Sequence, residues 1–281
     1  MNLLVLGLGY SAGHFLDRYR GRFSAIAATC RSASGEDRAM AAGVQPVRLD
    51  SDRAALAGAV AAADVVVASA APDGDGDPFL KVIGPGSLAG KRCLYLSTVG
   101  VYGDHSGAWV DETSQLRPVS QRSRWRLNAE RAWQDRADRD GATLDILRLS
   151  GIYGPGQSAI DTLRAGTARR IIKPGQVFNR IHVADIAHAL AAMIERSPGG
   201  IWNVTDDEPA PPQDVVAYAA GLIGMPVPPD LPYDQADLSP MGRSFYGENK
   251  RVSNARIRRD LAFTFEYPTY REGLAALAAV V

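Results

Sequence analysis

Three small residues near the start of the chain have the spacing of a phosphate-binding turn. Gly7, Gly9 and Ala12 form the pattern G-x-G-x-x-A directly after the apolar run 3–6, and a helix-like segment follows. In this pattern the first glycine permits a tight turn, the second lets backbone approach a pyrophosphate, and the third small residue lets the helix pack on its strand. Free N–H groups at the helix N-terminus would then hold the anion. The predicted cofactor contacts are Gly7, Gly9, Tyr10, Ser11 and Ala12.

A second chemical signal follows the next apolar segment, residues 24–29. Arg31 and Ser32 stand just beyond its end, and no acidic residue occurs before Glu36. At this place in a dinucleotide fold an acidic residue binds the 2′-hydroxyl of NAD, whereas an arginine pairs with the 2′-phosphate of NADP. We therefore predict that Arg31 and Ser32 select NADP(H), with NAD less favoured. The alternative for Arg31 is a solvated loop charge.

Three further residues end predicted strands on the same side. Asp50 follows the segment 45–49, where such folds often contact adenine, and a helix N-cap is an equal alternative for it. Ala70 and Ala71 follow the apolar strand that begins at residue 64, and their small size would leave room for a cofactor. The acidic loop 73–77 lacks the ligand spacing of a calcium site, so we expect a solvated turn and no metal.

The elements that must position these residues alternate between strand and helix. Strands at 3–6, 24–29, 45–49, 64–70 and 92–98 are separated by helical segments, which is typical of right-handed βαβ units and a parallel sheet. We predict an α/β fold: a Rossmann-type doubly wound parallel sheet with a small C-terminal substrate lobe. The predicted core is 1–150, with 176–206 returning to it, and the predicted lobe is 151–175 and 207–281.

Composition narrows the class of partner. The chain has 281 residues with 31 basic and 31 acidic ones, so no net charge draws it to nucleic acid or to an anionic membrane. No apolar run approaches the ~18 residues of a membrane span, and no signal sequence opens the chain, so we expect a cytoplasmic protein. The two cysteines, Cys30 and Cys93, are expected to be buried thiols.

Four later segments carry a family resemblance. Residues 96–103 read LSTVGVYG, 146–156 read ILRLSGIYGPG, 180–187 read RIHVADIA and 201–205 read IWNVT. They resemble, in order, the SSxxVYG, LRxxxxYGPG, xIHVxDxA and xYNV segments of the extended short-chain dehydrogenase/reductase family. That family includes nucleotide-sugar epimerases and dehydratases. The resemblance implies a nicotinamide cofactor and a small-molecule substrate.

The resemblance departs from the family at the catalytic pair. The family's Tyr-x-x-x-Lys lies on the helix after the fifth strand, and alignment on Glu130 puts Arg122 and Arg126 at those two positions. In the family the tyrosine transfers a proton, while the lysine lowers the pKa of that tyrosine and holds the nicotinamide ribose. Arg126 could still donate to the ribose, but Arg122 cannot exchange a proton near neutral pH. Thr98 matches the family's Ser/Thr that hydrogen-bonds the substrate carbonyl, so the pattern resembles the atypical branch of the family.

Other side chains could donate the proton in place of the missing tyrosine. Tyr102 and Tyr153 are candidates, with local packing as the alternative for each. The pair Tyr246 and Lys250 has the Tyr-x-x-x-Lys spacing but lies far too late in the chain, and we interpret it as coincidence. His182 is expected to support the fold beside Asp185.

Periodicity and turn residues predict the remaining elements. Helix 123–138 has Trp125, Ala129 and Trp133 on one stripe, which indicates core packing; in the resembling family this helix often forms a homodimer interface. Residues 171–172 and 177–179 are predicted to form a hairpin. The predicted helices that follow position 150 are 159–164, 213–223 and 270–279.

The segment around the hairpin is basic, and its positive residues are Arg164, Arg169, Arg170, Lys173 and Arg180. In the resembling family this segment contributes to the substrate lobe, so an anionic or nucleotide-sugar-like substrate is one interpretation and a solvated basic face is the other. The sequence leaves two hypotheses for the function. One is an oxidoreductase, epimerase or dehydratase, and the other is a non-catalytic NADP(H)-responsive sensor.

Overall fold

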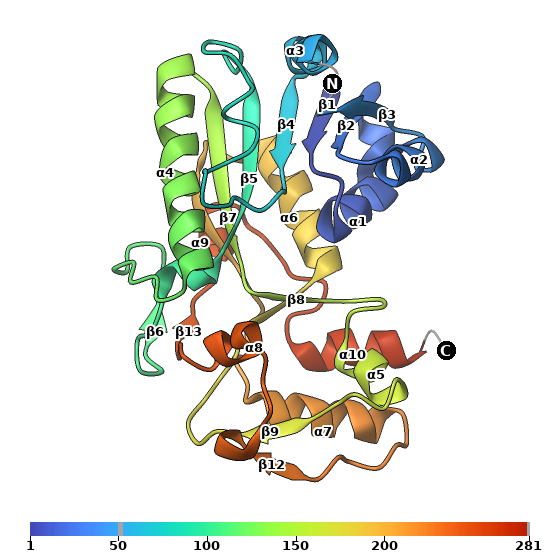
Figure 1. Ribbon diagram of the computed structural model, residues 1–281, viewed down its shortest axis with the longest axis vertical. Coiled ribbons are helices and arrows are strands. Elements are labelled where there is room, and N and C mark those ends of the chain that lie inside the picture. The colour runs from blue at the N-terminus through green and yellow to red at the C-terminus, as the bar shows by residue number, and fades with distance from the viewer. Residues whose placement is uncertain (50–52, 280–281) are drawn as a thin grey trace. The chain divides into compact units, whose positions relative to one another are not determined.

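The computed structural model describes residues 1–49 and 53–279, and these divide into two units (Figure 1). The first unit contains Met1–Thr98, Gln121–Arg148 and Ile186–Trp202. The second contains Val99–Ser120, Leu149–Asp185 and the chain from Asn203 onward. The segment that returns to the first unit thus starts at Ile186, whereas the sequence placed its start at residue 176. Residues 99–120 belong with the second unit.

The first unit is built on a seven-stranded sheet with the strand order β11-β7-β5-β4-β1-β2-β3. Each pairing from β3 through β2, β1 and β4 to β5 is parallel. The order reverses between β1 and β4, which is the doubly wound arrangement predicted from the sequence. The strands are β1 (Asn2–Leu6), β2 (Ala25–Cys30), β3 (Gln45–Arg48), β4 (Val65–Ala68), β5 (Arg92–Thr98), β7 (Thr143–Leu149) and β11 (Gly200–Val204).

Helices flank this sheet, as α/β architecture requires. They are α1 (Tyr10–Tyr19), α2 (Ala33–Ala41), α3 (Arg53–Ala62), α4 (Gln121–Asp140) and α6 (Val183–Arg196). Figure 1 shows α4 running alongside β5. On α4, Ala129 and Trp133 are fully buried, and Trp133 stacks on Tyr95 of β5 with the ring centroids 5.8 Å apart. The stripe predicted on this helix therefore packs in the core at these two residues, whereas its first member, Trp125, is half-buried.

The acidic loop 73–77 is exposed at residues 73–75, as predicted for a solvated turn, but not at its last residue. Asp77 is only 4% exposed, which corrects the prediction for this residue. Its carboxylate accepts hydrogen bonds from Phe79 N at 2.9 Å, Leu80 N at 3.1 Å and Trp133 Nε1 at 3.0 Å. A buried indole N–H needs an acceptor, and Asp77 supplies it from a segment that sequence pattern alone could not bring to Trp133.

A buried ion pair ties α4 to the two strands beneath it. Arg148 of β7 donates from Nη2 to Glu130 Oε2 at 2.8 Å and from Nε to Oε1 at 3.2 Å, and both side chains are almost completely buried. Ser97, next to the end of β5, donates its hydroxyl to the same carboxylate. Because both oxygens of Glu130 are bonded, the buried charge is fully compensated.

The second unit contains short elements joined by long connections. Its strands form three two-stranded parallel pairs, β8 (Gly151–Tyr153) with β10 (Arg180–His182), β9 (Arg170–Ile172) with β12 (Asp230–Pro232), and β6 (Trp109–Val110) with β13 (Arg251–Val252). Its helical segments are η2 (Val99–Tyr102), α5 (Ala159–Arg164), α7 (Pro212–Leu222), η3 (Tyr233–Gln235), α8 (Pro240–Phe245), α9 (Ala255–Asp260) and α10 (Tyr270–Ala279).

The hairpin predicted from residues 171–172 and 177–179 is wrong. Residues Arg170–Ile172 pair with β12, which lies about sixty residues later in the chain, and Phe178 forms an isolated bridge with Ala210. The Pro-Gly turn at 174–175 is present, since Gln176 N bonds to the carbonyl of Lys173 at 3.1 Å, but the segments on either side find other partners. Turn chemistry therefore identified the turn and not the pairing.

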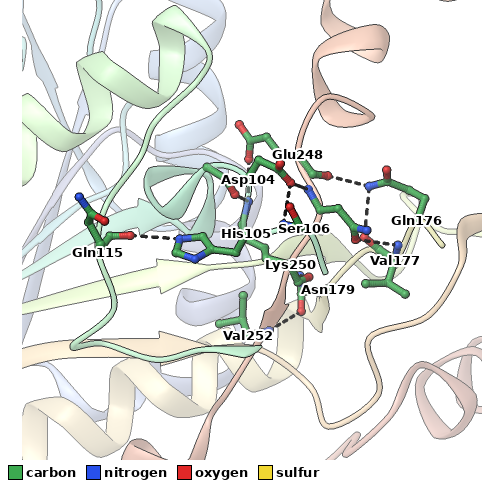
Figure 2. Close-up of polar contacts among 12 residues, drawn as sticks. Asp104, His105, Ser106, Gln115, Gln176, Val177, Asn179, Glu248, Lys250 and Val252 are labelled. Atoms are coloured by element: carbon green, nitrogen blue, oxygen red, sulfur yellow. Dashed lines mark hydrogen bonds and ion pairs between the residues drawn. The ribbon is translucent and has the colours of Figure 1, made fainter. Parts of the chain in front are cut away.

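A polar network joins three distant segments of the second unit (Figure 2). Lys250 is 6% exposed; its Nζ donates to the carbonyl of Gly103 at 3.0 Å and pairs with Glu248 at 2.6 Å. Asn179 donates to the carbonyl of Lys250 and accepts from Val252 N, both within 3.0 Å. Lys250 thus holds the loop after η2 in place, which supports the interpretation that its spacing from Tyr246 is coincidence.

Across the described residues, we find no helix with the length and apolar character needed to cross a membrane.

The Glu130 network should be a large contributor to stability. Changing Glu130 to Gln leaves Arg148 buried without a counter-charge, and we expect the free energy of unfolding in urea to fall by about 3 kcal/mol. The matched control is Glu195→Gln, which breaks the exposed pair between α6 and Arg22 and should cost less than about 1 kcal/mol. Equal losses for the two variants would show that the buried network is not a stabilising feature.

Candidate functional site

The turn after β1 has a backbone that requires glycine. Gly7 has φ +96°, in the left-handed region, and a Cβ built on it would lie 3.1 Å from the Cβ of Ala70. Its N–H donates to Thr29 Oγ1 at 2.8 Å, and its carbonyl accepts from the Ser69 hydroxyl. The turn is therefore held from both neighbouring strands. The sequence analysis did not identify Thr29 and Ser69, although hydroxyl residues near the ends of strands that flank a glycine turn are a usable signal.

Gly9 begins the helix that follows the turn. It is the N-cap of α1, and the carbonyl of Gly9 accepts from Gly13 N at 2.8 Å. A Cβ built on Gly9 meets nothing within 4 Å, so the space above this position is open. No acidic residue lies in the first turn of α1, where an anion would meet the positive end of the helix dipole.

The other predicted contacts of this helix differ in accessibility. Ser11 and Ala12 are buried, and Tyr10 is half-buried with its ring 4.7 Å from that of His14. Ala12 is at 0% exposure, which fits the predicted role of a small residue between helix and strand. Of the two alanines after β4, Ala70 packs against Gly7 and Ala71 is exposed.

Arg31 lies at the end of β2 with its side chain exposed. Among the described residues nothing bonds or pairs with its guanidinium, whereas the nearest acid in sequence, Glu36, pairs with Arg48 at 3.5 Å. Ser32 is the N-cap of α2: its hydroxyl accepts from Gly35 N at 3.2 Å. Asp50 lies outside the described residues.

The two arginines that the sequence aligns with the family's catalytic pair have different surroundings. Arg122, in the first turn of α4, is exposed and has no bonded partner in the described part of the chain. Arg126, one turn later, is half-buried; its Nη1 donates to the carbonyl of Leu96 at 2.7 Å and to the hydroxyl of Tyr95 at 3.2 Å. Its Nε and Nη2 are not hydrogen-bonded within the described residues. Thr98, the last residue of β5, is half-buried.

The two tyrosines named as proton donors lie in the second unit and are both buried. The Tyr102 hydroxyl donates to Asn203 Oδ1 at 2.7 Å, and the side chain is fully buried. The Tyr153 hydroxyl donates to the carbonyl of Thr269 at 3.4 Å, and burial raises the pKa of Tyr153. These environments favour the packing alternative, because each hydroxyl already has a protein acceptor.

His182 and Asp185 also support the fold, as expected. The carboxylate of Asp185 accepts from Glu266 N at 2.6 Å and from Tyr267 N at 3.1 Å. The ring of His182 packs against Tyr267 with the centroids 4.1 Å apart, and its Nδ1 accepts from Ala184 N. No group of three or more potential metal ligands gathers among the residues that the structure describes.

Several basic residues of the second unit form hydrogen bonds or ion pairs with other groups of the same unit. Arg169 donates to the carbonyl of Asp237 at 2.7 Å, and Arg170 pairs with the Asp230 carboxylate and donates to the carbonyl of Pro228. The Nζ of Lys173 donates to the carbonyl of Tyr246. Much of the predicted basic face is therefore used to join segments of the unit.

Comparison with known proteins agrees with this geometry. The profile of the NAD dependent epimerase/dehydratase family matches residues 3–205. A functionally unknown conserved protein from Silicibacter pomeroyi has a solved structure with 46% identity and a TM-score of 0.90, covering 99% of this chain and 98% of that chain. Protein YeeZ of Escherichia coli K12 is 29% identical over 213 residues, which are 73% of this chain and 71% of YeeZ.

A more distant structure has the same fold. Human epimerase family protein SDR39U1, solved with NADPH, is 18% identical, with a TM-score of 0.73 and complete coverage of both chains. The family match spans the glycine turn, β5 and the segments that resemble the short-chain dehydrogenases/reductases. The chain thus belongs to the NAD dependent epimerase/dehydratase family, which supports a nicotinamide cofactor and an oxidoreductase- or epimerase-like role.

Proposed function

We propose that the protein is an NADP(H)-dependent reductase of a small anionic carbonyl compound. The observation that carries the cofactor part is Arg31, an exposed guanidinium at the end of β2 with no bonded partner among the described residues. A 2′-phosphate would give this cation two or more charge-assisted hydrogen bonds. The nearest acid, Glu36, is paired with Arg48 and offers no competing acceptor for the 2′-hydroxyl of NAD. The human protein SDR39U1, which shares the fold, was solved with NADPH.

The residues present fit such a cofactor. The turn at Gly7 and the open space over Gly9 suit a pyrophosphate, and Arg126 has two guanidinium nitrogens left to reach a ribose. When bound, the reduced nicotinamide supplies a hydride. Side chains of the protein must bind the substrate and stabilise the charge that develops on it.

The two arginines on α4 bear on the direction of the proposed reaction. Oxidising an alcohol requires a base that removes its proton, and a guanidinium keeps its own proton near neutral pH. Reducing a carbonyl builds negative charge on the substrate oxygen, which Arg122 and the Thr98 hydroxyl can stabilise by hydrogen bonding, the final proton coming from water. The replacement of Tyr-x-x-x-Lys by Arg122 and Arg126 thus favours reduction over the alcohol oxidation that opens an epimerase reaction.

The second candidate is a non-catalytic NADP(H)-responsive sensor. The observation in its favour is the same replacement, since no tyrosine occupies the family's proton-transfer position. Turnover distinguishes the two functions.

The glycine turn gives a test that separates cofactor binding from folding. Gly9→Ala adds a methyl group in open space, so the fold should be unchanged, while the methyl group obstructs the approach of a pyrophosphate. We expect calorimetry to show NADPH affinity at least ~10-fold weaker. Gly13→Ala is the matched control: it too meets nothing within 4 Å, and alanine within a helix should stabilise by roughly 0.5–1 kcal/mol without affecting affinity. Unchanged affinity in Gly9→Ala would exclude this turn as the site.

The charge of Arg31 gives a test of cofactor choice. Arg31→Ala removes the proposed partner of the 2′-phosphate, so NADPH should bind ~10- to 100-fold more weakly while NADH affinity is unchanged. Tryptophan fluorescence titration with both nucleotides measures this. Arg139→Ala, on the exposed surface of α4, is the control and should leave both affinities as they are. If the wild type binds NADH and NADPH equally, Arg31 does not select the cofactor.

Turnover tests the choice between reductase and sensor. With a panel of small keto acids and aldehydes, NADPH absorbance at saturating cofactor should fall steadily in the wild type and at least ~100-fold more slowly in Thr98→Val, which is nearly isosteric but cannot donate. NADPH affinity should be the same in both proteins. No consumption of NADPH across the panel, despite tight binding, would favour the sensor.

A further inference from the structure

The second unit contains a cavity of 540 Å³, which is in the range of small-molecule sites at ~300–1,000 Å³. Three helices of this unit, α5, α7 and α10, contribute to its wall. Most of the wall is apolar, and Val215, Val216 and Leu274 are representative. All of its lining residues belong to the second unit, so the cavity does not include the glycine turn or Arg31.

One cation lines this cavity. Arg180 of β10 is half-buried, and its Nη1 donates to the carbonyls of Phe178 at 3.0 Å and Ala210 at 3.1 Å. Its Nε and Nη2 have no hydrogen-bond partner within the described residues. The guanidinium carbon lies 5.9 Å from the ring centroid of Tyr270, which also lines the cavity. Two carbonyls thus hold the guanidinium in place and leave its other N–H donors unbonded. Removing such donors from water costs free energy unless an acceptor binds them.

Several other polar groups of the wall are already bonded. Asp161 accepts from both the backbone N–H and the hydroxyl of Ser158 in a capping box at the start of α5. The hydroxyls of Thr162 and Thr167 donate to backbone carbonyls. Gln157 and Tyr270 also line the cavity, and neither the amide of Gln157 nor the hydroxyl of Tyr270 is hydrogen-bonded within the described residues. With one cation and two neutral donors, the cavity matches a single negative charge attached to an apolar body better than a diphosphate, whose higher charge one guanidinium does not offset.

One buried acid lies near this cation. Asp206 follows β11 and is 1% exposed; no hydrogen bond reaches its Oδ2 from the described residues. Burial raises the pKa of Asp206 despite the opposing effect of Arg180, while the charges of Asp207 and Glu208 add to the rise. Burial thus disfavours the charged form of Asp206, the form that would compete with a ligand anion for Arg180.

We propose that this cavity binds a small monocarboxylate with an apolar body, its carboxylate on Arg180 and its body against Val215, Val216 and Leu274. The cavity lies wholly within the second unit, so this site does not depend on cofactor binding by the first. The ligand is an aryl or alkyl carboxylate, taken either as the anionic substrate or as a separate effector.

The test uses the full chain without cofactor and 3-phenylpropanoate as the probe. Calorimetry at pH 7 should show one site per chain, while the neutral 3-phenylpropanamide and inorganic pyrophosphate should each bind at least ~10-fold more weakly. Arg180→Gln should weaken binding of the acid ~10- to 100-fold and leave the amide unchanged. Arg164→Gln, on the exposed face of α5 and absent from the cavity wall, is the matched control and should bind as the wild type does.

A second variant covers the case in which Arg180→Gln fails to fold. Val216→Phe leaves the guanidinium in place and fills the cavity, and binding of 3-phenylpropanoate should fall at least ~10-fold. Equal binding of the acid and the amide, tighter binding of pyrophosphate, or undiminished binding in Val216→Phe would each overturn the proposal. It would also be overturned if the acid fails to saturate the protein at concentrations up to about 10 mM. Repeating the titration during NADPH oxidation with a small keto acid separates the two roles, because 3-phenylpropanoate has no reducible carbonyl and should compete with the keto acid if the cavity is the substrate site, whereas an effector should not compete with it.

Discussion

The first unit depends on a backbone position that only glycine can occupy. At Gly7 the chain turns with a positive φ, and the Cβ of Ala70 stands where a side chain would have to lie. Thr29 and Ser69, from the neighbouring strands, bond to the N–H and the carbonyl of the same residue. The turn is therefore shaped by β1, β2 and β4 together, and it leaves Gly9 and the start of α1 facing open space. The proposed pyrophosphate contact therefore depends on backbone geometry more than on any side chain.

A second constraint acts at the other side of the sheet. The carboxylate of Glu130 is shared by Arg148 and Ser97, so α4 is fixed against β5 and β7 by a network that tolerates no missing partner. Arg126 adds a bond from the same helix to the end of β5. The position of α4, and with it that of Arg122 and Arg126 in its first turns, is thus set by buried polar contacts far from those two residues in the chain.

The sequence was sufficient where the fold depends on neighbours along the chain. The glycine spacing and the alternation of strands with helices are local patterns, and the doubly wound sheet follows from them. The role of Arg31 stays a prediction. It was insufficient where partners come from far away. Asp77 is buried because the indole of Trp133 needs an acceptor, and residues 170–172 pair with β12 although a turn follows them directly. The hydroxyl of Tyr102 is taken up by Asn203, about a hundred residues later, which no spacing rule could indicate.

The same distinction explains why the basic segment was ambiguous. A run of arginines is compatible with a solvated face, with an anion site or with structural bonds, and only the acceptors decide among these. Arg169 and Arg170 bond to carbonyls and an aspartate, so these two side chains join segments of the second unit. Arg180 differs because its two carbonyl partners use one nitrogen, burial raises the pKa of the neighbouring Asp206, and the side chain lines a largely apolar cavity. What separates a binding arginine from a structural one is therefore the number of acceptors within reach, a property of the folded chain and not of its composition.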